Sequence, residues 1–255
     1  MTNRHSVLSG GAMLGAIALL FSSTFPAPGQ VASPPASVPP PPKWERSASF
    51  GFTLTSGNSD TVLFTANAQA QKKWPNDELS FGANAGYGES DDVKNNDYLK
   101  GFGQYNRLFS ERFYGYLRLD AMHDDIADVD YRLTFSPGAG YYLIKREQTR
   151  LSAEAGPAFI YEKQGGDTQG YMTLRLAERF EHKIKDGARL WQSAEILPQV
   201  DDFDNFLVNA ELGVEAPLTK TLSLRAVLQD AYDHEPAPGR KKNDLKLVSA
   251  LAWKF

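Results

Sequence analysis

The chain has 255 residues, a formal net charge of −4 and a hydrophobic share of 42%, with a mean hydropathy of −0.41. This polarity excludes a bundle of membrane helices, because each helix needs about 20 consecutive apolar residues, and the acidic balance offers no basic surface to nucleic acid. There is no cysteine, which excludes disulfides, thiolate metal sites, cysteine nucleophiles and a lipid-modified N-terminal cysteine.

The N-terminal part of the chain resembles an export signal followed by a linker. A short basic start precedes an apolar run over residues 7–21, and small residues follow as far as Gly29. We predict a cleaved secretory signal over residues 1–29, because the apolar run is short for a transmembrane anchor. Residues 30–46 are rich in proline, which favours extended polyproline II structure, and they are predicted to form a periplasmic linker.

From residue 47 onward the polarity alternates every second residue, which is the period of a β-strand. Apolar Val62, Phe64 and Ala66, for example, alternate with Thr65 and Asn67. Turn residues interrupt the alternation repeatedly, and the pattern predicts twelve strands. They are expected at residues 47–56, 60–73, 77–90, 96–109, 112–124, 129–144, 149–163, 168–183, 187–199, 204–216, 221–235 and 242–255.

The two faces of these strands distinguish a soluble barrel from a membrane barrel, in which the apolar face meets lipid and the polar face lines the lumen. The predicted strands are about 13 residues long, enough for a tilted span that needs roughly 9 to 11 residues. The polar face carries both signs of charge and many glycines, which would weaken a solvent-facing strand but leave room in a lumen. We therefore predict an all-β fold, a closed antiparallel transmembrane barrel over residues 47–255. Its periplasmic turns are short, its other connections are longer and acidic, and both chain ends lie on the periplasmic side.

Two features of the apolar face bear on this prediction. Aromatic residues such as Tyr87, Phe109 and Tyr141 fall near strand ends, which suits aromatic girdles at the two membrane interfaces. Glu178 and Asp230 also fall on this face, where a charge is costly. We expect either a bulge that shifts the register there or a position close enough to a strand end for the carboxylate to reach water.

The chain ends on two aromatic residues, Trp253 and Phe255, which share one face of the last predicted strand. A terminal Phe with an aromatic residue two positions earlier resembles the signal that delivers bacterial outer-membrane barrels to their assembly machinery, although Ala250 stands where glycine is usual. We predict that Trp253 and Phe255 form this assembly signal. The expected partners are periplasmic chaperones, the barrel-assembly machinery, and the lipid and lipopolysaccharide of the outer membrane.

Nine charged residues on the polar face are candidates for lining the lumen. If they pair across neighbouring strands they close a structural barrel, and if they stay unpaired they line a narrow channel. We expect Arg132, Glu154 and Arg175 to adjoin on three successive strands. We expect Glu211 to lie beside Arg225, with each pair bathed in lumen water and contributing about 0 to 1 kcal/mol. The nine candidates are Arg118, Asp120, Arg132, Glu154, Arg175, Arg179, Glu211, Glu215 and Arg225.

The sequence contains no recognisable catalytic constellation. A lipid-hydrolysing barrel would need a serine, a histidine and an orienting polar group close together. The predicted barrel has three histidines, His123, His182 and His234, and no serine in a nucleophile setting, so we interpret them as ordinary rim residues. We predict no enzymatic activity and no cofactor.

Four carboxylates, Asp124, Asp125, Asp128 and Asp130, fall in and around one predicted connection. Oxygen ligands at such short spacing suit Ca²⁺ or Mg²⁺. The segment lacks the glycine and the distal glutamate of a helix–loop–helix calcium site, and a solvated acidic rim explains it as well. We predict no resident metal and keep these four as candidate ligands, including for divalent ions shared with anionic lipopolysaccharide.

Six short motifs occur in order along the predicted barrel: Ser56-Gly57-Asn58-Ser59, Asp128-Val129-Asp130-Tyr131-Arg132, Gly138-Ala139-Gly140-Tyr141, Glu154-Ala155-Gly156-Pro157, Asp201-Asp202-Phe203 and Glu235-Pro236-Ala237-Pro238-Gly239. In this order and spacing the chain resembles a bacterial family of salt-induced outer-membrane proteins of unknown function. The resemblance implies a Gram-negative outer-membrane barrel, and no catalytic residue or ligand. We interpret the chain first as a narrow channel for ions or small solutes linked to salt response. The alternatives are a structural envelope barrel and, third, a lipid-modifying enzyme.

Overall fold

The computed structural model describes residues 42–55 and 61–255. The predicted signal, most of the predicted linker and the motif Ser56-Gly57-Asn58-Ser59 lie outside the described residues. No helix in the described part of the chain is long and apolar enough to cross a membrane. The described residues form twelve strands and one turn of 3-10 helix: β1 (Trp44–Thr55), β2 (Thr61–Lys73), β3 (Asp77–Ser90), β4 (Val93–Leu108), β5 (Phe113–Asp124), β6 (Val129–Lys145), β7 (Thr149–Gln164), β8 (Asp167–Lys183), η1 (Lys185–Gly187), β9 (Arg189–Pro198), β10 (Phe206–Pro217), β11 (Leu222–Asp233) and β12 (Asn243–Lys254).

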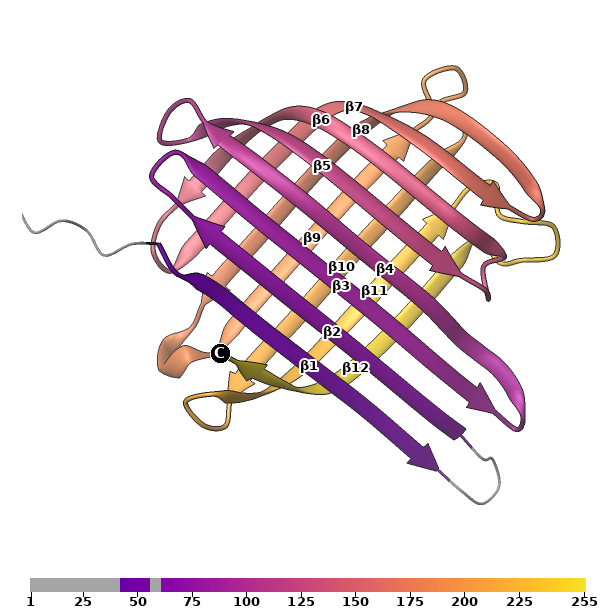
Figure 1. The fold of residues 1–255 in the computed structure, drawn as a ribbon, viewed down its shortest axis with the longest axis horizontal. Helices are drawn as coiled ribbons and strands as arrows, with labels where there is room; N and C mark the ends of the chain where they lie inside the picture. The colour runs from indigo at the N-terminus through magenta and orange to yellow at the C-terminus, as the bar shows by residue number, and fades with distance from the viewer. Residues whose placement is uncertain (1–41, 56–60) are drawn as a thin grey trace, which may run out of the picture. The chain divides into compact units, whose positions relative to one another are not determined.

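The strands form one closed antiparallel sheet, in which each strand pairs with its neighbours in sequence and β1 pairs with β12 (Figure 1). Ser47 lies opposite Lys254, and Phe50 lies opposite Leu251. The pairing of β1 with β12 closes the sheet, which is the condition for a sheet to sit in lipid. The prediction of a closed, all-β, twelve-strand antiparallel barrel is confirmed.

The barrel begins earlier than the sequence pattern predicts. β1 starts at Trp44 rather than at residue 47, so the last residues of the predicted linker belong to the sheet. The indole of Trp44 stacks on Phe81 with ring centroids 6.3 Å apart, and its backbone lies opposite Lys72. The sequence pattern did not reveal this part of the strand because Arg46 points outward here. An apolar residue at that position would have extended the alternation of polar and apolar residues.

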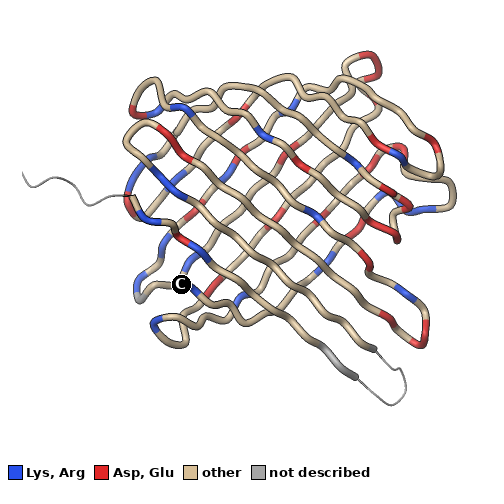
Figure 2. The backbone as a smooth tube through the Cα atoms, viewed as in Figure 1, with Lys and Arg blue, Asp and Glu red and all other residues tan. Residues whose placement is uncertain are grey.

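The two ends of the barrel differ in charge. We call the end that carries Trp44 and Lys254 the terminal end, and the opposite one the distal end. The prediction that the distal connections are longer is wrong for two of them, since Asp91-Asp92 and Gly165-Gly166 are two-residue turns with positive φ throughout, as tight hairpins require. Acidic residues gather at the distal end, and Lys and Arg are more frequent at the terminal end (Figure 2).

Apolar side chains cover the outside of the barrel. Large residues such as Phe52, Leu119 and Leu247 are exposed on the outward face of β1, β5 and β12. An exposed apolar belt of this extent would drive aggregation in water, whereas it matches the hydrocarbon of a bilayer. The inverted pattern predicted from the strand faces is therefore the one that the structure has.

Buried side chains fill part of the interior. Tyr114, Tyr116 and Tyr142 from β5 and β6 form one buried cluster, with the rings of Tyr114 and Tyr142 5.0 Å apart. A Cβ at Gly140 would collide with the ring of Tyr114, so this inward glycine makes room for an aromatic side chain. A second cluster contains Ala158, Ile160, Leu197 and Leu207. These clusters fill the lumen beside β5 to β10.

Candidate functional site

The nine charged residues share one face of the strands with the buried interior side chains. Arg118 lies opposite Ser136, and Glu215 lies opposite Arg225. Arg118 binds Asp120 at 2.6 Å. Arg179 is on the same face but is exposed and forms no ion pair with a described residue. Among the nine predicted lumen residues, Arg179 is thus the one cation that pairs with no residue in the described part of the chain.

A central network joins the charged residues of β7, β8 and β9. Arg175 donates from Nη1 to Glu154 Oε2 at 2.8 Å and from Nε to Glu195 Oε2 at 2.9 Å. Glu154 Oε1 also accepts from Gln104 Nε2 at 2.8 Å and from the hydroxyl of Tyr114 at 2.9 Å, which ties β4 and β5 to β7. The expected adjacency of Glu154 and Arg175 is present.

This network is much drier than expected. Arg175 is only 4% exposed, because its guanidinium lies against the ring of Tyr116 at 5.4 Å and the tyrosine cluster covers it. The expectation that every lumen pair is bathed in water is therefore wrong for Arg175. Removing one partner of such a buried pair costs about 3 to 5 kcal/mol, far more than a surface pair contributes.

The partner of Arg225 is Glu215 rather than the expected Glu211. Arg225 Nη2 lies 2.8 Å from Glu215 Oε2, and two further cations, from β9 and β12, also contact this buried carboxylate. Glu211 instead lies opposite Gln229, whose amide donates to it at 2.9 Å. The short turn between β10 and β11 fixes this register, which places Glu211 and Glu215 at different heights in the lumen.

Two ion pairs cross the lumen near the distal end. Arg132 Nη2 on β6 lies 3.0 Å from Asp233 Oδ2 on β11, and Lys246 Nζ on β12 lies 3.6 Å from Asp124 Oδ2 on β5. Each pair joins strands five places apart in a ring of twelve, so each spans the interior. We call these four residues the distal constriction.

Each half of the distal constriction also has a partner on a neighbouring strand. Arg132 binds Glu162 on β7, where the sequence had suggested Glu154, and Asp124 lies 3.7 Å from Lys100 on β4. Above them, the β11–β12 connection approaches the β7–β8 turn, since a Cβ at Gly165 would lie 3.1 Å from Pro238 Cδ. The lumen is thus narrowed at the distal end by side chains and by a loop.

The four candidate metal ligands do not converge. Asp124 faces the lumen, whereas Asp125 binds Lys94 at 2.9 Å and Asp130 binds Lys163 at 2.6 Å. The hydrogen bond from the Lys94 ammonium lowers the pKa of the Asp125 carboxyl. Asp128 occupies a left-handed turn position with φ of 57°. Among the described residues, no group of three or more metal-ligating side chains is placed to hold an ion.

The other singled-out residues lie apart from the lumen network. His123 contacts the Asp130 carbonyl, His182 contacts Thr149, and His234 lies beside Tyr232. Glu178 and Asp230 lie on the outer face in regular register, so of the two expected explanations the bulge is absent at both. Glu178 accepts a hydrogen bond from Gln192. Asp230 lies three residues from the end of β11, and its Oδ1 bonds to no described residue.

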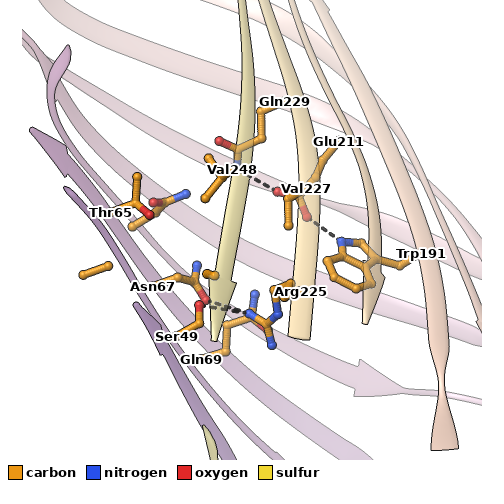
Figure 3. A pocket seen from close by; sticks show the side chains of 13 residues that line it. Ser49, Thr65, Asn67, Gln69, Trp191, Glu211, Arg225, Val227, Gln229 and Val248 are labelled. Atoms are coloured by element: carbon orange, nitrogen blue, oxygen red, sulfur yellow. Dashed lines mark hydrogen bonds between the residues drawn. The ribbon is translucent and has the colours of Figure 1, made fainter. Parts of the chain in front are cut away.

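A cavity remains in the lumen, lined by side chains of β1, β2, β3 and β12 and by side chains of β9, β10 and β11 (Figure 3). It has a volume of about 40 Å³ and lies between Ser49, Asn67, Gln69 and Asn84 on one side and β9, β10 and β11 on the other. Sequence reasoning overlooked these amides because it followed charge. The signal was present, since Thr65, Asn67, Gln69 and Gln71 alternate with alanines along β2.

The barrel resembles solved outer-membrane β-barrels at low sequence identity. The NanC porin superposes with a TM-score of 0.50 at 6% identity, over 82% of this chain and 98% of that chain. The KdgM porin gives 0.47 at 5% identity, over 84% and 99%. The translocator domain of the autotransporter NalP from Neisseria meningitidis gives 0.45 at 14% identity, over 83% and 87%. The similarity to the NanC porin shows the fold alone.

Comparison of the sequence with curated proteins finds no match. The family model described as "Protein of unknown function, DUF481" matches residues 48–255, which is the whole barrel from the fifth residue of β1 onward. The chain therefore belongs to the DUF481 family.

Proposed function

We propose that this chain is an outer-membrane barrel that conducts ions and small solutes through a narrow lumen. The observation that carries the proposal is a cavity lined in part by amide and charged side chains, inside a barrel whose outside is apolar. A purely structural barrel has no need to keep polar side chains around an internal space, because each buried polar group that loses water without a partner costs free energy.

The cavity sets the size of what passes. A volume of about 40 Å³ holds about three or four water molecules, given roughly 10 to 15 Å³ for each. Twelve strands enclose more space than the eight-stranded barrels that side chains fill, and less than porins with 16 to 18 strands. The proposed path therefore admits water, ions and the smallest solutes. In this structure the distal constriction must separate before they cross.

The alternative of a structural barrel is favoured by the packed half of the lumen, where the tyrosine cluster and the Arg175 network leave little room. Planar-bilayer recording of the purified, refolded protein separates the two functions. A channel gives a small, steady conductance with weak preference between anions and cations. A membrane that stays silent after verified insertion indicates a structural barrel.

The same proposal covers how the protein is exported, how the barrel is assembled and where in the cell it is located. We propose that residues 1–29 direct export and that Trp253 and Phe255 guide insertion by the assembly machinery into the outer membrane, among lipid and lipopolysaccharide. The link to salt response rests on the family resemblance described above. Membrane fractionation of cells grown at low and high salt, followed by immunoblotting, tests the location and the salt response together.

A further inference from the structure

One wall of the lumen carries no charge along its middle. The inward residues of the described parts of β12, β1, β2 and β3 are small or uncharged there, and the charged ones lie toward the two ends of the barrel. The cavity lies against this wall (Figure 3). The uncharged inward residues include Ser47, Ser49, Asn67, Gln69, Gln71, Ser80, Asn84, Val248, Ala250 and Ala252.

The amides of this wall have hydrogen-bonding capacity to spare. Gln69 lines the cavity, and its side chain bonds to no described residue. Asn84 receives one long hydrogen bond, from the hydroxyl of Tyr98 at 3.5 Å. Asn67 accepts from Arg225 at 3.3 Å, which leaves its own amide hydrogens available. Each amide offers two donors and a carbonyl acceptor, so the wall presents several free donors and acceptors to the cavity.

The charges on the facing wall are already engaged. Arg225 donates twice to Glu215, at 2.8 and 3.2 Å. Glu211 accepts from the indole of Trp191 at 2.6 Å and from Gln229 at 2.9 Å. An anion in this cavity would lose its water shell and face Glu211, which only neutral donors contact and which pairs with no described cation. A hydroxylated neutral solute would exchange its water for amide hydrogen bonds at little cost.

We infer that the cavity is a transit site for small uncharged polyols, in the size range of glycerol and erythritol. The inference rests on the proposed channel function and names its preferred solute class. Space for about three or four water molecules sets the scale near glycerol, whose three hydroxyl groups share that space with three carbons, and erythritol is the next larger polyol. The free amides of Gln69 and Asn84 would bind the hydroxyls, and the carboxylate of Glu211 opposite would repel anions.

Osmotic swelling of vesicles that contain the refolded protein tests this inference. Vesicles with the wild-type protein should swell in glycerol and erythritol and stay unchanged in sucrose. Gln69→Leu and Asn84→Leu should each slow erythritol influx roughly three- to tenfold, the loss expected for one hydrogen bond. Gln71→Leu is the matched control, because it is the next inward residue of β2, binds Glu45 and lies outside the cavity. Heat-modifiable migration on gels verifies that each variant has folded.

The outcomes separate the inference from the function on which it rests. If the wild-type protein conducts ions but erythritol influx is unchanged in both cavity variants, the polyol site is wrong and the channel stands. The inference is also overturned if Gln71→Leu slows influx as much as Gln69→Leu does. If the inserted wild-type protein passes neither ions nor any solute, the channel function itself fails.

Discussion

The distal constriction predicts a conductance that depends on salt more steeply than the bulk solution does. The perturbation is the double change Asp233→Asn with Lys246→Gln, which removes one partner from each cross-lumen pair and leaves the net charge unaltered. It strands no charge, because Arg132 keeps Glu162 and Asp124 keeps Lys100. The variant should therefore fold and insert as the wild-type protein does.

The expected magnitude follows from the exposure of the pairs. The side chains of Asp233 and Lys246 are 20% and 23% exposed, whereas those of their partners Arg132 and Asp124 are 11% and 4% exposed. Water therefore screens each pair from one side, and each is worth about 1 kcal/mol, the upper end for a screened pair. Two such pairs hold the narrowed state by about 2 kcal/mol, which is about 30-fold in its ratio to the separated state. Salt weakens them, because the Debye length falls from about 10 Å at 0.1 M to about 3 Å at 1 M.

The assay is planar-bilayer conductance divided by the conductivity of the bathing solution, from 0.1 to 1 M KCl. The wild-type value should rise across this range, and the double variant should start high and stay flat. Asp244→Asn is the matched control, since Asp244 lies two residues from Lys246 on the same face and forms no ion pair with a described residue. A wild-type value that stays flat, or a variant that follows the wild-type curve, refutes the reasoning.

Three further predictions concern stability and assembly. Arg175→Met should lower the free energy of unfolding by about 3 kcal/mol, because it leaves Glu154 and Glu195 without a cation. The control variant at an exposed residue, Arg179→Met, should change the free energy of unfolding by less than about 0.5 kcal/mol. Equal losses for the two variants in urea titrations of the vesicle-bound protein would contradict the buried network. Asp230→Asn should raise the free energy of unfolding by about 1 kcal/mol, because a lipid-facing carboxylate is costly; a loss in the same titration would mean that Asp230 has a partner. Changing Trp253 and Phe255 to Ala should leave export intact and make the protein accumulate in the periplasm, and normal heat-modifiable migration of that variant would argue against an assembly signal.

The architecture was predictable because it depends on one repeated local pattern. Alternation with period two assigns each side chain to the lumen or to the outside, and apolar residues such as Phe64 and Leu212 are exposed on the outward face as that pattern requires. The neighbours of each strand follow from its turns. Glu215 lies opposite Arg225 in the register that follows the turn between β10 and β11, and the error over Glu211 came from matching strands without matching heights.

The contacts across the lumen were not predictable in the same way. Arg132 meets Asp233 because the interior is narrow enough for β6 and β11 to face each other through their side chains, and no sequence spacing encodes that width. The dryness of Arg175 depends on tyrosines from β5 that cover it. The cavity is what remains after both sides are packed, so the alternation along β2 indicates the polar side chains, and only the three-dimensional structure shows which of them line a cavity.

The most direct test concerns a solute path along the uncharged wall formed by β12, β1, β2 and β3. It uses the absence of cysteine from the chain. Ala250→Cys places a thiol at the lining of the cavity, and Leu251→Cys places one on the outward face of the same strand. Conductance is recorded before and after a membrane-impermeant, charged thiol reagent is added. The proposed path predicts that the reagent blocks current through Ala250→Cys and leaves Leu251→Cys unaffected. Unchanged current through a fully modified Ala250→Cys protein would contradict it.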